Sequence, residues 1–148
     1  MIKITGEYTF TKMIDGKVVG VDKFHNIVTS KVYEFLLKSM TGETPNGVEV
    51  NYFAFGTGTT AVTEDDTTLE AEYFRKIPTS KTWIGKQFTA ICQLGKDEAN
   101  TTITEVGLFA DGTSAEDTGT LLSHALRTIE KNSNITYNIQ YRLTLEET

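Results

Sequence analysis

The sequence predicts a mainly β protein: a single-domain antiparallel β-sandwich or barrel-like fold with one short α-helix. Threonine supplies 25 of the 148 residues, beside six tyrosines and eight phenylalanines, and these residue types suit strands better than helices. Seven or eight segments of alternating apolar and polar residues are separated by turn signals, at the spacing of a sandwich or barrel. Because the composition shows no break, we expect residues 1–148 to form one domain.

Residues 1–28 predict an N-terminal β-hairpin. The apolar residues of its first strand share one face: Ile2, Ile4, Tyr8 and Phe10. Asp15-Gly16 is a tight-turn signal. The returning strand is expected to place Val19, Val21 and Phe24 inside, as in a half-buried strand.

Residues 30–40 predict the one helix. Its apolar residues follow helical spacing, at Val32, Phe35, Leu36 and Met40. Thr29 or Ser30 can cap its first turn, and the turn formers of residues 41–47 end it.

The remaining strands are expected between residues 50 and 146. They cover residues 50–55, 83–95, 101–110, 120–129 and 134–146. The pattern of residues 69–76 is ambiguous between a helical turn and an irregular strand. In the strand 83–95, Cys92 shares a face with apolar residues, which favours a core position for this thiol.

Three glycines indicate places where the backbone turns or approaches another segment. Gly56 and Gly58 end the strand 50–55, while Gly107 lies inside a predicted strand, where glycine is typical of a bulge or a close backbone approach.

Glu105 lies in the same predicted strand as Gly107. A carboxylate there is either exposed or paired with a cation such as Arg127 or Lys131, and we predict a buried ion pair with Lys131.

No pattern in the sequence indicates a catalytic, metal or cofactor site. His25 and His124 lack second ligands at metal-site spacing, so each is predicted to lie on the surface or on a strand face. The glycine-rich residues 56–60 lack the lysine or third glycine of a phosphate-binding loop. The acidic run 64–66 is expected to be a solvated loop tip. We therefore expect no cofactor, no metal and no enzymatic activity.

The charge balance excludes further classes of partner. With 20 acidic and 14 basic residues, the chain lacks the cationic surface on which most nucleic-acid binding depends, so no direct nucleic-acid contact is expected. No apolar run is long enough to cross a bilayer, and no membrane association or leader segment is expected. The single cysteine fits a reducing compartment.

Six motifs, taken in order, resemble small β-rich virion proteins of tailed bacteriophages, the modules of capsid decoration, tail, collar and baseplate. The resemblance runs from about residue 26 to the C-terminus. The motifs are Asn26-Ile27-Val28, Phe53 to Thr59, Asp65 to Leu69, Ile103 to Phe109, Gly119 to Leu122, and Ile129-Glu130-Lys131.

The resemblance implies a non-enzymatic virion structural protein that binds other virion proteins, such as major capsid or tail and neck proteins. It also implies a homo-oligomer, often a trimer, made in the host bacterial cytoplasm. Related tail-fibre modules continue into a shaft, whereas this sequence stops after its last strand. We therefore expect a capsid decoration or cement subunit, or a neck, tail or baseplate adaptor.

Two regions are candidate partner contacts. One is the N-terminal strand with Ile2 and Ile4, since a terminal strand can add to the sheet edge of a neighbour. The other is the loop 57–68 with Thr57 and Thr59.

Two other functions stay open from the sequence. A carbohydrate-binding β-sandwich in host recognition would use Trp83 and the tyrosines as stacking platforms, although core or interface packing also accounts for them. A hydrolase would need two carboxylates that folding brings to about 5–9 Å from each other.

Overall fold

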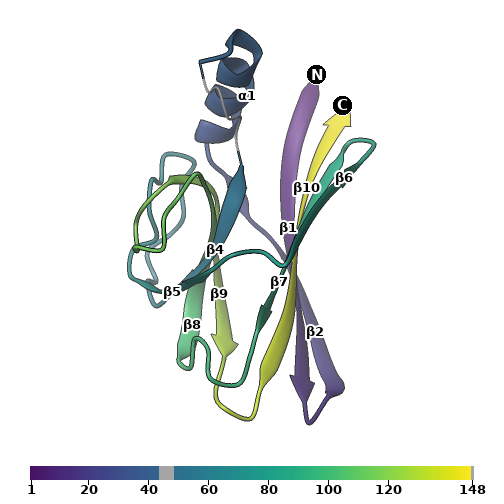
Figure 1. Ribbon diagram of the computed structural model, residues 1–148, viewed down its shortest axis with the longest axis vertical. Coiled ribbons are helices and arrows are strands. Elements are labelled where there is room, and N and C mark those ends of the chain that lie inside the picture. The colour runs from purple at the N-terminus through teal and green to yellow at the C-terminus, as the bar shows by residue number, and fades with distance from the viewer. Residues whose placement is uncertain (44–48, 148) are drawn as a thin grey trace.

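The computed structural model describes residues 1–43 and 49–147. It is a β-sandwich of two five-stranded antiparallel sheets with one short helix at one end (Figure 1). The predicted fold class is confirmed, and the two sheets select the sandwich rather than the barrel.

The first sheet, sheet A, contains both chain termini. Its order is β2-β1-β10-β7-β6. The strands are β1 (Ile2–Ile14), β2 (Lys17–His25), β6 (Ser80–Ile84), β7 (Gln87–Leu94) and β10 (Thr136–Glu147). β1 pairs with β10 along its whole length, from Ile2 opposite Glu147 to Met13 opposite Thr136. The N-terminal strand is thus an interior strand of the sheet, with β2 and β10 on its two sides.

The second sheet, sheet B, takes the middle of the chain. Its order is β3-β9-β8-β4-β5. The strands are β3 (Ile27–Val28), β4 (Val50–Gly56), β5 (Glu72–Lys76), β8 (Thr102–Ala110) and β9 (Thr120–Glu130). Residues 72–76 are therefore a strand with a register shift against β4, which resolves the ambiguity of that segment. Helix α1 (Lys31–Thr41) follows β3 and ends at Gly42, whose φ of 77° is left-handed.

The main core lies between the two sheets and is rich in aromatic side chains. Sheet A contributes Tyr8, Phe10 and Tyr141, and sheet B contributes Phe53 and Phe55, all at most 1% exposed. The rings of Phe10 and Phe55 meet edge to face across the interface, with centroids 6.4 Å apart. Alternation along each strand places these residues inward, as the sequence pattern predicts.

Two details of sheet A differ from the prediction. Residues 83–95 form a hairpin rather than one strand, because Gly85, with φ 59°, allows a tight turn between β6 and β7. Val19 and Val21 are exposed rather than buried. Phe24 takes the inner face of β2, and Val21, an odd number of residues away, must point to the other side.

Candidate functional site

A buried histidine connects two strands of sheet B to the loop between β4 and β5. His124 on β9 bonds through Nε2 to Glu105 Oε1 on β8, at 2.8 Å, and through Nδ1 to Asp66 Oδ2 in the loop, also at 2.8 Å. Glu105 is fully buried and His124 is 4% exposed. We call these three residues the histidine latch. His124 lies on a strand face, which is one of the two positions predicted for it. The prediction of a solvated acidic tip is wrong at Asp66, whose side chain is only 24% exposed and is bonded to His124.

The Glu105 carboxylate also binds the backbone of the loop. Gly58 N–H donates to Oε2 at 2.7 Å, Ala71 N–H to Oε2 at 2.8 Å, and Glu70 N–H to Oε1 at 2.8 Å. Thr104 Oγ1 donates to the Gly58 carbonyl at 2.7 Å. One carboxylate therefore fixes both ends of the segment 58–71 against the outer face of sheet B.

The three predicted glycines leave space for this arrangement. A Cβ at Gly58 would lie 2.2 Å from Glu105 Oε2, and a Cβ at Gly56 would lie 2.5 Å from the Ala71 carbonyl oxygen. At Gly107 a Cβ would lie 2.5 Å from a methyl group of Leu69, which packs into a small outer cluster. Gly56 also sits at a register shift, while Gly107 is a close approach rather than a bulge. The two sequence motifs that contain Gly58 and Glu105 thus meet in space, where together they hold the loop between β4 and β5.

Hydrogen bonding sets the charge state of the latch. Burial alone would raise the pKa of Glu105, but bonds from His124 and three backbone N–H groups outweigh it and lower that pKa. Burial alone would lower the pKa of His124, but its bonds to Glu105 and Asp66 outweigh it and raise that pKa. These shifts, with a lowered pKa at Asp66 as well, all favour an imidazolium between two carboxylates.

The predicted ion pair between Glu105 and Lys131 is absent. Lys131 is 2% exposed, and its Nζ donates to Asn100 Oδ1 at 2.6 Å and to the Asn132 carbonyl at 3.1 Å. Burial lowers its pKa, against the nearby charges of Glu98 and Asp97. The sequence did not indicate His124 as the partner of Glu105, because the two residues meet only through the register of β8 and β9.

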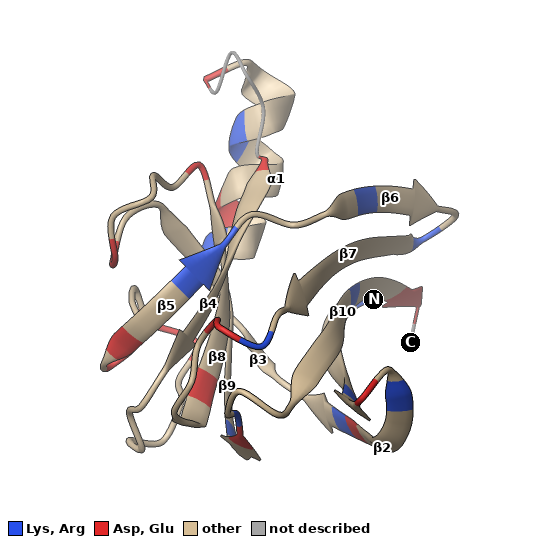
Figure 2. Cartoon of the chain, turned by 60° about the horizontal axis from the view of Figure 1, so that its bottom comes forward, with Lys and Arg blue, Asp and Glu red and all other residues tan. Residues whose placement is uncertain are grey.

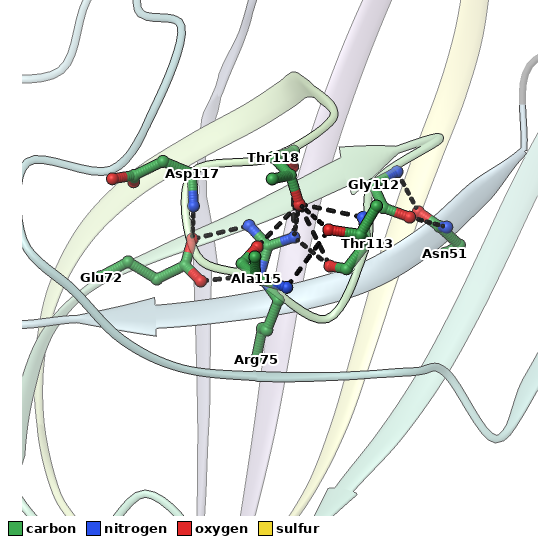
Figure 3. A network of polar contacts seen from close by, with 8 residues as sticks. All are labelled: Asn51, Glu72, Arg75, Gly112, Thr113, Ala115, Asp117 and Thr118. Atoms are coloured by element: carbon green, nitrogen blue, oxygen red, sulfur yellow. Dashed lines mark hydrogen bonds and ion pairs between the residues drawn. The ribbon is translucent and has the colours of Figure 1, made fainter.

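A second buried cluster holds the loop between β8 and β9 (Figure 3). Arg75 on β5 forms a two-pronged pair with Glu72, at 2.7 and 2.8 Å, and donates to the carbonyls of Thr113 and Thr118 at 2.9 and 3.1 Å. Its guanidinium lies 4.7 Å from the centre of the Phe109 ring. We call Glu72, Arg75, Thr113 and Thr118 the arginine clasp. No sequence pattern signalled it, because Arg75 is 38 residues from Thr113 along the chain.

An apolar groove of about 450 Å³ lies between α1 and sheet A. In Figure 1, α1 stands at the same end of the molecule as the termini and the β6–β7 hairpin. The apolar side chains that line the groove are Val32, Phe35, Leu36, Val50, Trp83, Phe88, Leu122, Leu143 and Leu145.

The groove continues the inner face of sheet A beyond the main core. Trp83, Phe88 and Leu143 lie opposite one another on β6, β7 and β10, so they share this face. Trp83 is nevertheless 78% exposed, and core packing does not account for it. On α1, Val32 is buried, but Leu36 and Met40 are exposed, because only the start of the helix packs on the sandwich.

The structure separates the two predicted contact regions. Ile2 is 68% exposed, while Ile4 packs beside Val32. Thr57 and Thr59 lie in the latched loop over sheet B, with N–H groups bonded to the Ala71 carbonyl and to Glu70 Oε1. Because β1 is an interior strand, removing residues 1–12 would disrupt sheet A itself, so that deletion cannot report on partner binding alone.

Three further features of the described residues concern metal binding, the cysteine thiol and membrane-spanning helices. Across 1–43 and 49–147, no three His, Cys, Asp or Glu side chains, the histidine latch included, are arranged so that they could hold a metal ion. Burial raises the pKa of the Cys92 thiol to about 12, so this core thiol is a poor nucleophile at neutral pH. Within the same residues, no helix is long and apolar enough to span a membrane.

Comparisons with protein-family models, with curated proteins and with solved structures find no match to this chain.

Proposed function

We propose that the protein is a non-enzymatic structural subunit of a tailed-bacteriophage virion, which binds a neighbouring virion protein in the apolar groove. The observation that carries the proposal is Trp83, a large aromatic side chain that is 78% exposed beside an apolar groove. Aromatic residues in exposed apolar patches are typical of protein interfaces. The phage context comes from the resemblance of the six sequence motifs.

The groove fits an extended apolar segment of the neighbouring protein. In the described part of the chain, β6 pairs only with β7, so one edge of β6 keeps free backbone donors and acceptors. A strand added there would run beside Trp83 and place alternate side chains in the groove. Main-chain hydrogen bonds and apolar burial would then act together.

The charge distribution fits a protein partner better than a nucleic acid. Basic residues are spread over several strands (Figure 2). Several of those on strands pair with acids: Arg75 with Glu72, Lys76 with Glu98, Lys81 with Glu49, and Arg127 with Asp22. A net charge of −6 adds repulsion from phosphates.

The polar clusters support a structural rather than a catalytic role. Both ring nitrogens of His124 and both oxygens of Glu105 are bonded within the fold. Arg75 is likewise bonded to Glu72 and to loop carbonyls. A catalytic group must reach a substrate atom, whereas these groups are occupied in holding loops.

Particle incorporation tests the proposal. Virions purified from infected cells should contain the chain at a fixed stoichiometry, measured by quantitative mass spectrometry. Trp83→Ser should reduce incorporation at least about tenfold, as expected for an interface anchor. Tyr73→Ser, which removes another exposed aromatic outside the groove, should not.

Three results would overturn the proposal. They are absence of the chain from particles, normal incorporation of Trp83→Ser, and an oligomer of the pure protein that Trp83→Ser dissociates. The last result, measured by light scattering, would identify a second copy of this chain as the occupant of the groove.

Carbohydrate binding remains the second candidate because Trp83 offers an exposed stacking face. The polar residues that line the groove are few: Ser39, Lys86 and Gln87. Sugar recognition depends on several hydrogen bonds, so this lining favours a protein segment. Glycan-array binding that Trp83→Ser abolishes would reverse this preference.

A further inference from the structure

We propose that the histidine latch is a proton-controlled switch: charged His124 holds Asp66 and Glu105 at once, and neutral His124 releases Asp66 and with it residues 63–66 of the loop. The inference does not depend on the partner bound in the groove. It concerns how the fold itself responds to pH.

Both hydrogen bonds of the His124 ring can form together only when each of its two nitrogens carries a proton. Asp66 and Glu105, when ionised, only accept hydrogen bonds, and each has an oxygen 2.8 Å from a different nitrogen of His124. A neutral imidazole has one N–H, so one carboxylate would then face a nitrogen lone pair. The charged groups against the ring are Asp66 from the loop and Glu105 from β8; on the β3 side, His124 lies opposite uncharged Ile27.

The two carboxylates are held very differently. Glu105 is fully buried and accepts three backbone N–H bonds besides the histidine. The Asp66 side chain is 24% exposed. Its other bonds, from the N–H and hydroxyl of Thr63, belong to its own turn. Water can therefore replace the bond between His124 and the partly exposed Asp66, but it does not reach the buried Glu105. When His124 becomes neutral, Asp66 is the carboxylate that is released.

Release of Asp66 would reach helix α1. The carbonyl of Glu64, two residues before Asp66, accepts the N–H of Ser30 at 2.9 Å. Ser30 is the residue at the start of α1, and the first turns of α1 form one wall of the groove. The switch therefore connects a titratable group on the outer face of sheet B to the mobility of the groove wall.

The bonds to both carboxylates outweigh burial and raise the pKa of His124 from its ordinary value of 6.5. The latch is therefore closed below that pH, and opening requires more alkaline solution.

Amide hydrogen exchange in the intact protein tests the proposal. Rates are measured by NMR between about pH 6 and pH 9, corrected for intrinsic exchange, while nitrogen shifts follow the His124 ring. The Ser30 amide should lose protection about tenfold or more as the His124 ring becomes neutral. The amides of Gly58 and Ala71, bonded to Glu105, should keep theirs. The exposed His25 serves as a reference histidine in the same spectra.

Two variants sharpen the result. Asp66→Ala removes the side chain that bonds His124, so Ser30 should exchange fast at every pH. Glu64→Gln changes a neighbouring charge but keeps the carbonyl that binds Ser30, and should behave like the unmodified protein. Equal Ser30 protection before and after His124 titrates, or parallel loss at Ser30, Gly58 and Ala71, would overturn the proposal.

Discussion

The outer face of sheet B and the groove beside sheet A differ in what covers them. Loops held by buried charges cover the outer face of sheet B, whereas apolar side chains of the groove stay exposed to water. Over sheet B, buried charges hold two loops in place: Glu105 and His124 hold the segment 58–71, and Arg75 holds the loop before β9. In the groove, Trp83 and Leu36 remain exposed. The loops are stabilised at the cost of buried charges, whereas the groove keeps apolar area in water that only a partner would cover.

This contrast predicts opposite consequences of mutation. Side chains of the latch and clasp should matter for folding, because removing one member leaves another buried charge unpaired. Exposed side chains of the groove should matter little for folding and strongly for binding. The following variants test this difference, from the largest expected effect to the smallest.

Glu105→Gln should give the largest loss of stability. The amide cannot neutralise His124, and its NH2 group replaces one of the oxygens that accept backbone N–H bonds. We expect the free energy of unfolding to fall by about 3–5 kcal/mol, as when one member of a buried ion pair is removed. Urea denaturation followed by circular dichroism measures it. The control is Glu116→Gln on an exposed loop, and a loss below about 1 kcal/mol for Glu105→Gln would contradict the role of Glu105.

Arg75→Met should destabilise the protein by about 2–3 kcal/mol, because Glu72, 2% exposed at its side chain, loses a charged donor. The matched control is Arg127→Met, whose partner Asp22 is about a third exposed. An exposed pair of that kind contributes about 0–1 kcal/mol. Both variants are measured by the same urea titration. Equal losses in the free energy of unfolding would show that the buried arginine clasp stabilises the protein no more than the exposed pair does.

The pH dependence should be a smaller effect that distinguishes the latch from the clasp. His124 has a raised pKa in the fold, so its contribution is complete below about pH 6.5 and is lost as the pH rises through the folded pKa. Asp66 and Glu105 have lowered pKa values despite burial. Their contribution is present above about pH 4.5 and is lost as the pH falls through their folded pKa values.

Unfolding experiments at a series of pH values measure this dependence. His124→Gln should remove the alkaline part, whereas Arg75→Met should leave that part unchanged, since arginine stays charged throughout. An unchanged alkaline slope in His124→Gln would assign the dependence to other groups.

Trp83→Ser should have the smallest effect on stability, within about 0.5 kcal/mol, because the side chain is mostly in water already. The control is Phe10→Ala, which removes a core ring and should cost about 3–5 kcal/mol. A large loss for Trp83→Ser in urea denaturation would mean that Trp83 supports the fold rather than a partner surface.

The sequence was sufficient for most strands and for the positions of the anchoring glycines. Alternation identified β1, β4, β8, β9 and β10 closely, because a strand with one buried face shows its period directly. It found the strand β2 but gave Val19 and Val21 the wrong face, and it missed the turn between β6 and β7. β2 and β6 are the two edge strands of sheet A. At an edge, apolar residues lack the burial that makes the pattern informative.

The candidate sites needed the tertiary structure. The motifs marked Gly58, Glu105 and Gly107, but not that His124 and Asp66 meet Glu105, because those contacts depend on strand register and on the path of a loop. The groove depends on how far sheet A extends beyond sheet B at the α1 end, which no local pattern encodes. Local periodicity therefore determined the strands, and the packing of distant segments decided which charges are buried and which apolar face stays open.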